Sequence, residues 1–433
     1  MNRTTHLAAA AVALVAFTAC GGSSKSNSSP PPPPPPPKPV VVTTFQAAST
    51  LIGQKDWITP PAATNPCAAG SLYRPYGAAA WTGSTLLVPD TFSGRLLAFS
   101  PIPPVESEPA AMPAAAWAIG EPDLATCNGA SSGVTLYIPQ APAVTGTKLA
   151  VADSGYNQVF VYATIPLDSG ATASRITVGD GLGACSPTSL LDPRGAVLTT
   201  VHLIVADTGN NRVLVFEPDV HDLSKYVLKT VLGQHDDLTT GTLCAANDTD
   251  GNGTAGNDTS LLPDARTMYQ PKAVWTDGTR LIVADSLNNR LLVWNSFPTV
   301  SGQAPDAVVG QASFTVAATG TAAANELFDP ESIASDGTKL FVADTGNNRV
   351  VVFPSIPSTN TPAATIVLGQ ADFGCWSPND DGNVAGTACN GASGAAPSQR
   401  TLSDPTGVAV VDGLLTITDT GNDRVLIYRP PAP

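Results

Sequence analysis

Residues 340–353 read LFVADTGNNRVVVF, and this stretch decides the fold. Two apolar runs rich in β-branched residues flank a polar turn that begins at Asp344 and ends at Arg349. Runs of this kind joined by Gly and Asn are typical of a β-hairpin. Both runs are apolar almost throughout instead of alternating with polar residues, so we expect each hairpin to be covered on both faces.

The hairpin phrase occurs six times along the chain. The copies lie at residues 86–99, 149–162, 203–216, 281–294, 340–353 and 415–428. Each turn begins with an aspartate, namely Asp90, Asp153, Asp207, Asp285, Asp344 and Asp419. Five turns carry an arginine five residues later, namely Arg95, Arg212, Arg290, Arg349 and Arg424. Self-similar copies at this spacing indicate a repeat fold with one structural unit per copy.

Two shorter elements accompany each hairpin. A strand that starts with proline precedes it, as in DPRGAVL at 192–198, and a strand that ends in glycine follows it, as in VLGQ at 231–234. One unit therefore holds four strands: strand a (the proline strand), strands b and c (the hairpin) and strand d (the glycine-ended strand). Six such units predict an all-β, six-bladed β-propeller of four-stranded antiparallel blades.

The two ends of the repeat region predict how the ring closes. The first element is a d strand at 51–54, whereas the last is a c strand at 425–428. We expect the N-terminal strand to complete the last blade, because this pairing removes two open sheet edges.

The motif VADTGNNRVLVF at 205–216, together with the DPTGVA strand at 404–409 that precedes the last hairpin, resembles the NHL-repeat family of six-bladed propellers. The resemblance covers roughly residues 46–430, with Gln158 in place of the arginine and Leu287 in place of the turn glycine as departures. It implies the fold and leaves the function open, since propellers host many functions.

The first residues have the pattern of an export signal. Arg3 precedes a short apolar run, Leu7 to Ala19, which is too short to span a membrane. Phe17-Thr18-Ala19-Cys20 resembles a bacterial lipobox, which implies a signal peptide at 1–19 and lipidation at Cys20. The alternative is an ordinary cleaved signal.

Residues 20–45 then form an anchor and a Gly/Ser/Pro-rich linker, and the propeller domain is expected at 46–430. Gly21 follows Cys20, so no retention-type Asp is present. This favours an exported, lipid-anchored protein of the outer membrane, on its periplasmic or surface side.

We interpret the repeated turn as structural. Asp344 can accept hydrogen bonds from the turn's own N–H groups, Gly346 and the asparagines tolerate positive φ, and Arg349 can reach a carboxylate or backbone carbonyls. The alternative is a ring of aspartates that binds cations or a ligand.

The connections between strands d and a are long and irregular, and they emerge on the same face as the b–c turns. Their ranges are 55–74, 122–138, 181–192, 235–270, 312–329 and 371–404. Long insertions in a repeat usually carry function, so this face is the candidate binding face.

All six cysteines after Cys20 lie in these loops, and an even number in an exported chain favours disulfides. The pairs expected between neighbours are Cys67–Cys127, Cys185–Cys244 and Cys375–Cys389. Zinc binding is the alternative, although no CxxC spacing occurs.

The loop 235–270 contains a possible calcium motif. Asp248, Asp250 and Asn252 match the start of an EF-hand-like loop, and Asp258 lies near its end. The alternative is a solvated polar loop.

The net charge of −14 disfavours a nucleic-acid partner. With only four histidines and no nucleophile motif, the chain favours a monomeric, non-catalytic scaffold that binds an envelope protein or glycan. The alternatives are a calcium-assisted propeller hydrolase or lyase acting on a small ester, lactone or amide, and a purely structural envelope component.

Overall fold

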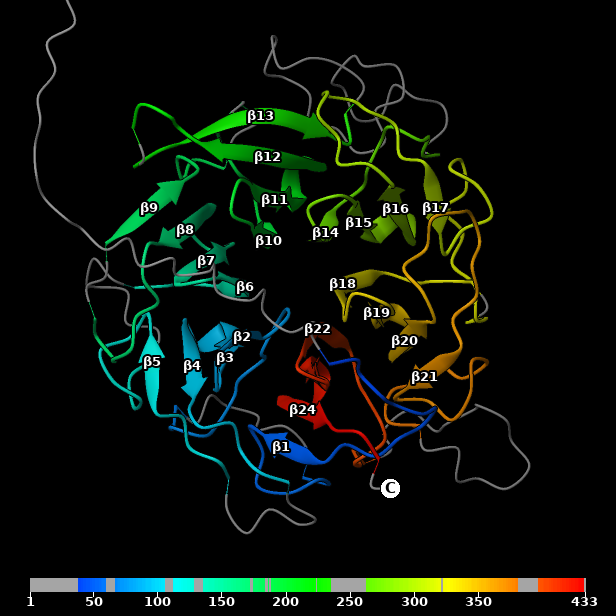
Figure 1. The fold of residues 1–433 in the computed structure, drawn as a ribbon. Helices are drawn as coiled ribbons and strands as arrows, with labels where there is room; N and C mark the ends of the chain where they lie inside the picture. Colours follow the sequence, from blue (N-terminus) through cyan, green and yellow to red (C-terminus); the bar gives the residue numbers. More distant parts are fainter. Residues whose placement is uncertain are drawn as a thin grey trace, which may run out of the picture. The chain divides into compact units, whose positions relative to one another are not determined.

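The computed structural model of the chain describes eleven segments. These are residues 38–59, 67–105, 112–127, 135–171, 174–183, 186, 188–222, 224–234, 262–320, 322–380 and 396–431. The unit that starts at Pro37 is an all-β ring of six four-stranded antiparallel sheets around one axis, as Figure 1 shows. The predicted six-bladed propeller is therefore confirmed.

The first three blades each follow the order a, b, c, d. Blade 1 contains β2 (Ala80–Thr82), β3 (Thr85–Asp90), β4 (Arg95–Phe99) and β5 (Trp117–Ile119). Blade 2 contains β6 (Pro139–Thr145), β7 (Lys148–Asp153), β8 (Gln158–Tyr162) and β9 (Arg175–Val178). Blade 3 contains β10 (Pro193–Leu198), β11 (Leu203–Asp207), β12 (Arg212–Pro218) and β13 (Tyr226–Leu232).

The last three blades repeat this order. Blade 4 contains β14 (Pro271–Thr276), β15 (Leu281–Asp285), β16 (Arg290–Trp294) and β17 (Ala307–Val309). Blade 5 contains β18 (Pro330–Ser335), β19 (Leu340–Asp344), β20 (Arg349–Phe353) and β21 (Ile366–Leu368). Blade 6 contains β22 (Pro405–Val411), β23 (Leu414–Asp419), β24 (Arg424–Tyr428) and β1 (Thr50–Ile52).

Strand β1 closes the ring. It pairs antiparallel with β24, and Leu51 lies opposite Leu426. The first strand of the described residues thus serves as strand d of the last blade, as the sequence predicts.

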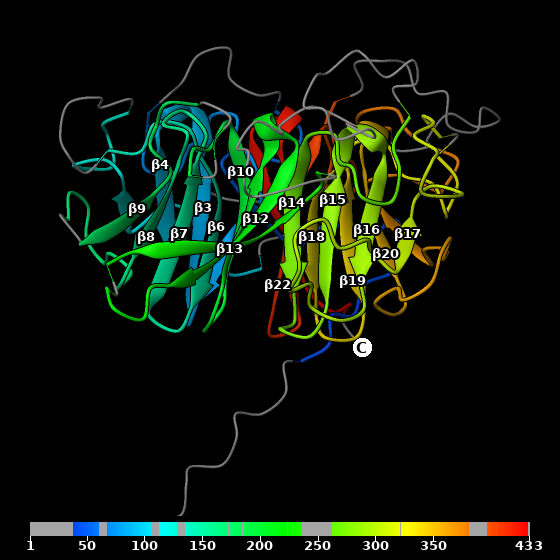
Figure 2. The ribbon, with the colours of Figure 1, turned by 90° about the horizontal axis from the view of Figure 1, so that it is seen from above.

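Five of the six b–c turns contain a short 3₁₀ helix. These are η1 (Thr91–Ser93), η2 (Thr208–Asn210), η3 (Ser286–Asn288), η4 (Thr345–Asn347) and η5 (Thr420–Asn422). Figure 2 shows the b–c turns and the d–a loops at one end of the ring. We call this end the d–a face and the opposite end the a–b face.

The hydrophobic core lies between the blades. One buried cluster lies between the two sheets of each neighbouring pair, and the pair formed by blades 6 and 1 has its own cluster too. This arrangement explains why strands b and c are apolar on both faces. The inner strands need small residues, because a Cβ on Gly195 would lie 2.6 Å from the carbonyl oxygen of Lys272 in the next blade.

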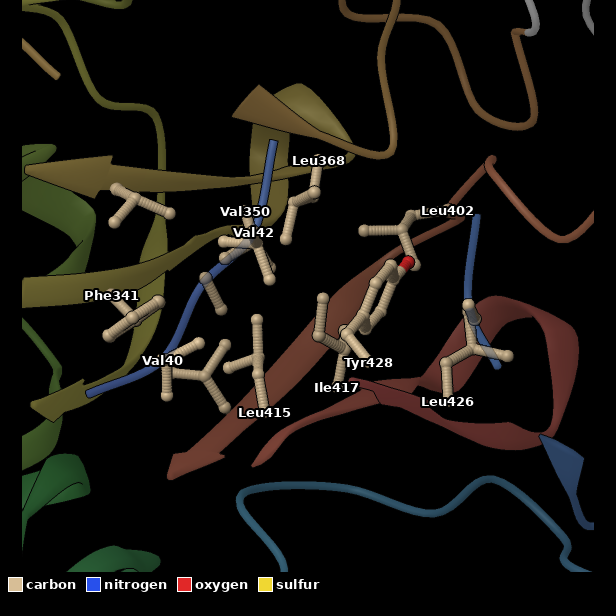
Figure 3. Close-up of a cluster of buried hydrophobic side chains, with 14 of the residues drawn as sticks. Val40, Val42, Phe341, Val350, Leu368, Leu402, Leu415, Ile417, Leu426 and Tyr428 are labelled. Atoms are coloured by element: carbon tan, nitrogen blue, oxygen red, sulfur yellow. The ribbon is translucent and has the colours of Figure 1, made fainter. Parts of the chain in front are cut away.

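The described chain packs on the propeller from its first residues. Val40 and Val42 are buried between blades 5 and 6, beside Phe341 and Leu415 (Figure 3). The N–H of Val40 donates to Asp336 over 3.0 Å. This segment therefore begins on the a–b face.

Within the described ranges, no helix has the length and apolar character needed to cross a membrane.

Candidate functional site

The five Asp–Arg turns hold buried ion pairs. In each, Arg Nε lies 2.6–2.8 Å from Asp Oδ2, and both side chains are at most 5% exposed. Asp344 also accepts from the Phe328 N–H over 2.7 Å and from Asn347 Nδ2 over 2.9 Å. Burial raises the pKa of Asp344, and the charge of Arg349 opposes this shift. Both carboxylate oxygens already have partners, so this aspartate serves the turn.

Each turn arginine also holds the loops around it. Arg349 Nη2 donates to the carbonyl oxygens of Ala323 and Glu326 before its blade, and Nη1 donates to that of Phe373 after its blade. The guanidinium fork thereby fixes the ends of two successive d–a loops.

The same turn joins its blade to the next one. Thr345 Oγ1 donates to the carbonyl oxygen of Pro405 over 2.7 Å, and Asn348 Oδ1 accepts from the Asp404 N–H over 2.7 Å. Asn348 is the residue with positive φ, at 51°. Gly346 does not adopt a positive φ, and its position needs glycine for another reason: a Cβ would lie 2.6 Å from the Phe328 ring.

The b–c turn of blade 2 has no Asp–Arg ion pair. Gln158 stands where the arginine would be, and Asp153 instead accepts three backbone N–H groups, from Tyr137, Ile138 and Tyr156, over 2.8–3.2 Å. Backbone donors therefore replace the guanidinium.

A polar network with a buried centre, Lys272 and Glu331, lies at the d–a end of the central channel. Each of four blades contributes the residue that follows the proline at or before the start of its strand a. These residues are Tyr76, Arg194, Lys272 and Glu331. The Tyr76 hydroxyl donates to Glu331 and accepts from Arg194 Nη1 over 2.8 Å. Lys272 Nζ donates to Glu331 and, over 2.7 Å, to Asp329. The four side chains come from blades 1, 3, 4 and 5, so they bridge the channel.

Burial controls the ionisation of this network. It raises the pKa of Glu331 to about 7, while the charge of Lys272 opposes the shift. Burial and the nearby Glu331 charge also raise the pKa of Tyr76 well above its usual value. The phenol therefore stays protonated and can donate.

Sequence reasoning missed this network, although a signal for it exists. DPRG at 192–195, QPKA at 270–273 and DPES at 329–332 place a charged residue at the same repeat position, on the strand next to the axis. Three charges at the most crowded place of the fold indicate a paired polar cluster.

The exposed aromatic side chains of the described segments lie on the d–a face. Among the large hydrophobic residues that are exposed in the described segments, four are aromatic: Phe92 (44%), Tyr137 (50%), Tyr269 (36%) and Trp376 (55%). All four belong to b–c turns or d–a loops. The exposed residues Val201, Val220 and Val300, which lie in a–b or c–d connections, are aliphatic.

The predicted disulfide between Cys67 and Cys127 is confirmed, with Cα atoms 5.8 Å apart. It joins the d–a loops before and after blade 1. Cys375 is also disulfide-bonded. Cys20, Cys185, Cys244 and Cys389 lie outside the described residues, so the other two pairings and the lipidation stay predictions.

The predicted calcium motif, Asp248, Asp250, Asn252 and Asp258, also lies outside the described residues. Within the described segments, no group of three or more His, Cys, Asp or Glu side chains is arranged to hold a metal ion.

No family model and no curated protein matches the chain. Similar solved structures include an auxiliary nutrient binding protein from Bacteroides thetaiotaomicron (11% identity, 89% of this chain and 75% of that one, TM-score 0.46). A streptogramin B lyase is similar at 9% identity over 90% of both chains, with a TM-score of 0.41. At TM-scores below 0.5, these similarities carry no argument about function.

Proposed function

We propose that this protein is a non-catalytic binding propeller that recognises an envelope protein or glycan through its d–a face. The observation that carries the proposal is that, in the segments the structure describes, the large exposed aromatic side chains all lie on that face. Exposed aromatic residues have a large contact area and lose little conformational entropy on binding, so they mark interaction sites.

The channel mouth supports a binding role over catalysis. The charged groups of the network are satisfied by one another, since Lys272 pairs with Asp329 and Glu331, and Arg194 pairs with Asp192 over 2.9 Å. A catalytic acid or base must instead reach the substrate. The alternative, a calcium-assisted hydrolase or lyase, depends on residues 248–258, and no feature of the described residues favours it.

The proposal includes membership of the NHL-repeat family and lipid anchoring at Cys20, with an outer-membrane location. We infer that the d–a face points away from the membrane. The described chain begins at the opposite, a–b face, where Lys38 pairs with Asp412. A tether that leaves from this face would point the aromatic d–a face away from the membrane.

The test compares two triple variants of the full chain. Phe92→Ala/Tyr137→Ala/Trp376→Ala removes aromatic groups from the d–a face, and Val201→Ala/Val220→Ala/Val300→Ala is the matched control from a–b and c–d connections. Binding is measured to a polysaccharide array, to isolated peptidoglycan and to purified envelope proteins. We expect the wild type and the control to bind one of these probes and the aromatic variant to lose at least tenfold in affinity. Equal binding by both variants, with melting temperatures unchanged, would contradict the proposal.

A further inference from the structure

The central channel contains a cavity of about 130 Å³ beside the polar network. Its walls are mostly apolar, with contributions from Ala78, Ala143, Val197, Val274 and Ile333. Its polar groups are Tyr76, Arg194, Lys272, Glu331 and Ser332. The cavity therefore combines an apolar space with a hydrogen-bonding end, at a volume close to that of apolar cavities that accept a benzene ring.

The Tyr76 hydroxyl is the only group that links Arg194 to Glu331 in this network. It accepts from the guanidinium and donates to the carboxylate. A ligand that replaces it must do both. A ligand carboxylate would face Glu331, and a ligand ammonium group would face Arg194, so each would meet a like charge. A hydroxyl group satisfies both partners.

Tyr76 lies outside the strand ladder of its own blade, and its backbone N–H donates instead to Thr91 Oγ1 over 2.9 Å. In blades 3 to 6, the first proline of strand a pairs with the turn aspartate, as Pro330 does with Asp344. In blade 1 the ladder between β2 and β3 begins only at Ala80, opposite Leu87. Side-chain contacts hold the preceding residues instead, including a bond of 3.1 Å from the Gly77 N–H to Thr406. Turning the Tyr76 side chain leaves these backbone hydrogen bonds in place and breaks the two hydrogen bonds of its hydroxyl, which the ligand hydroxyl would replace.

We propose that the channel cavity is a binding site for a small hydroxyl compound, a phenol or a compact alcohol, and that Tyr76 closes it. The apolar body of the ligand occupies the cavity. Its hydroxyl takes the place of the Tyr76 hydroxyl between Arg194 and Glu331, while the tyrosine side chain turns towards the d–a face. This site is separate from the exposed aromatic groups and does not depend on what they bind.

The test titrates phenol and anisole into the full chain and follows binding by calorimetry and ligand-observed NMR. Anisole has the same ring but cannot donate a hydrogen bond. We expect phenol to bind one site per chain at least tenfold more tightly than anisole, because one buried hydrogen bond to a charged group is worth about that factor. Tyr76→Ala, which removes the competing hydroxyl, should bind phenol at least tenfold more tightly than the wild type.

Two controls separate this site from others. Tyr76→Ala/Ala143→Leu fills the cavity and should abolish phenol binding, whereas the Phe92→Ala/Tyr137→Ala/Trp376→Ala variant should bind phenol as the wild type does. The absence of saturable phenol binding by the wild type and by a folded Tyr76→Ala variant would overturn the proposal. Equal affinity for phenol and anisole would overturn its hydroxyl part. If Tyr76→Ala does not fold, the affinities of the wild type for phenol and anisole still test the proposal.

Discussion

Asp423 accepts a hydrogen bond from the backbone N–H of Arg74 over 2.7 Å, and this bond joins the last blade to the first. At four other junctions between blades an asparagine side chain accepts the same bond, namely Asn157, Asn211, Asn289 and Asn348. Burial of the Asp423 carboxyl raises its pKa to about 6. The ring therefore closes through the only one of these five acceptors that can ionise.

Replacing this carboxyl should stabilise the ring at neutral pH. The pKa of Asp423 in the folded state, about 6, lies above its unfolded value of 3.8, so the folded state binds the proton more tightly. The contribution of Asp423 to the free energy of unfolding should therefore fall as the pH rises from about 4 to about 6. Asp423→Asn keeps the acceptor and should raise the free energy of unfolding at pH 7.5 by roughly 1–2 kcal/mol. Urea denaturation at pH 4.5 and 7.5 checks this, and a greater gain at pH 4.5 would contradict it.

Breaking one turn ion pair should destabilise the propeller strongly. Arg349→Gln leaves the buried Asp344 without its cation, which should cost about 3–5 kcal/mol. The matched control is Arg280→Gln, because Arg280 and Asp277 form a partly exposed pair whose loss should cost about 1 kcal/mol or less. Urea denaturation measures both variants, and similar losses would show that the buried pair has no special role.

The disulfide between Cys67 and Cys127 should stabilise the chain by constraining the unfolded state. The two residues are 60 positions apart, and a disulfide that closes a loop of this length is worth about 4 kcal/mol. Cys67→Ser/Cys127→Ser should lose this amount in denaturation under oxidising conditions. Under reducing conditions the wild type and the variant should have the same free energy of unfolding, and a difference that persists after reduction would contradict this role of the disulfide.

The segment before β1 should stabilise the fold through its buried side chains, which alternate with exposed ones. Val40 and Val42 are at most 5% exposed, whereas Val41 is 47% exposed. Val40→Ala/Val42→Ala should lower the free energy of unfolding by about 2–3 kcal/mol, because each change removes buried methyl groups. Val41→Ala is the control and should change it by less than about 0.5 kcal/mol. Equal effects would mean that this segment does not pack as Figure 3 shows.

Calcium removal tests the predicted motif at 248–258. If Asp248 and Asp250 bind the ion, millimolar calcium should raise the melting temperature and chelation should reverse this rise. Asp248→Asn/Asp250→Asn should abolish the calcium response. A melting temperature that does not respond to calcium in the wild type would contradict the site.

The sequence alone determined the fold, because the information is local and repeated. Each hairpin carries its own turn chemistry, as in Asp344 to Arg349, and the offset between the first d strand and the last c strand predicts the closure of β1 on β24. The pairing of neighbouring loops predicted the disulfide between Cys67 and Cys127, although Cys127 also lies in a loop next to that of Cys185.

The tertiary structure alone decided what lies at the axis. Tyr76, Arg194, Lys272 and Glu331 are up to 255 positions apart, and no local pattern brings them together. Only closing the ring brings these inner strands within hydrogen-bonding distance and removes water from Glu331, which shifts its pKa. Side-chain exposure is likewise a property of the folded surface, so the gathering of Phe92, Tyr137 and Trp376 on one face became visible only in three dimensions.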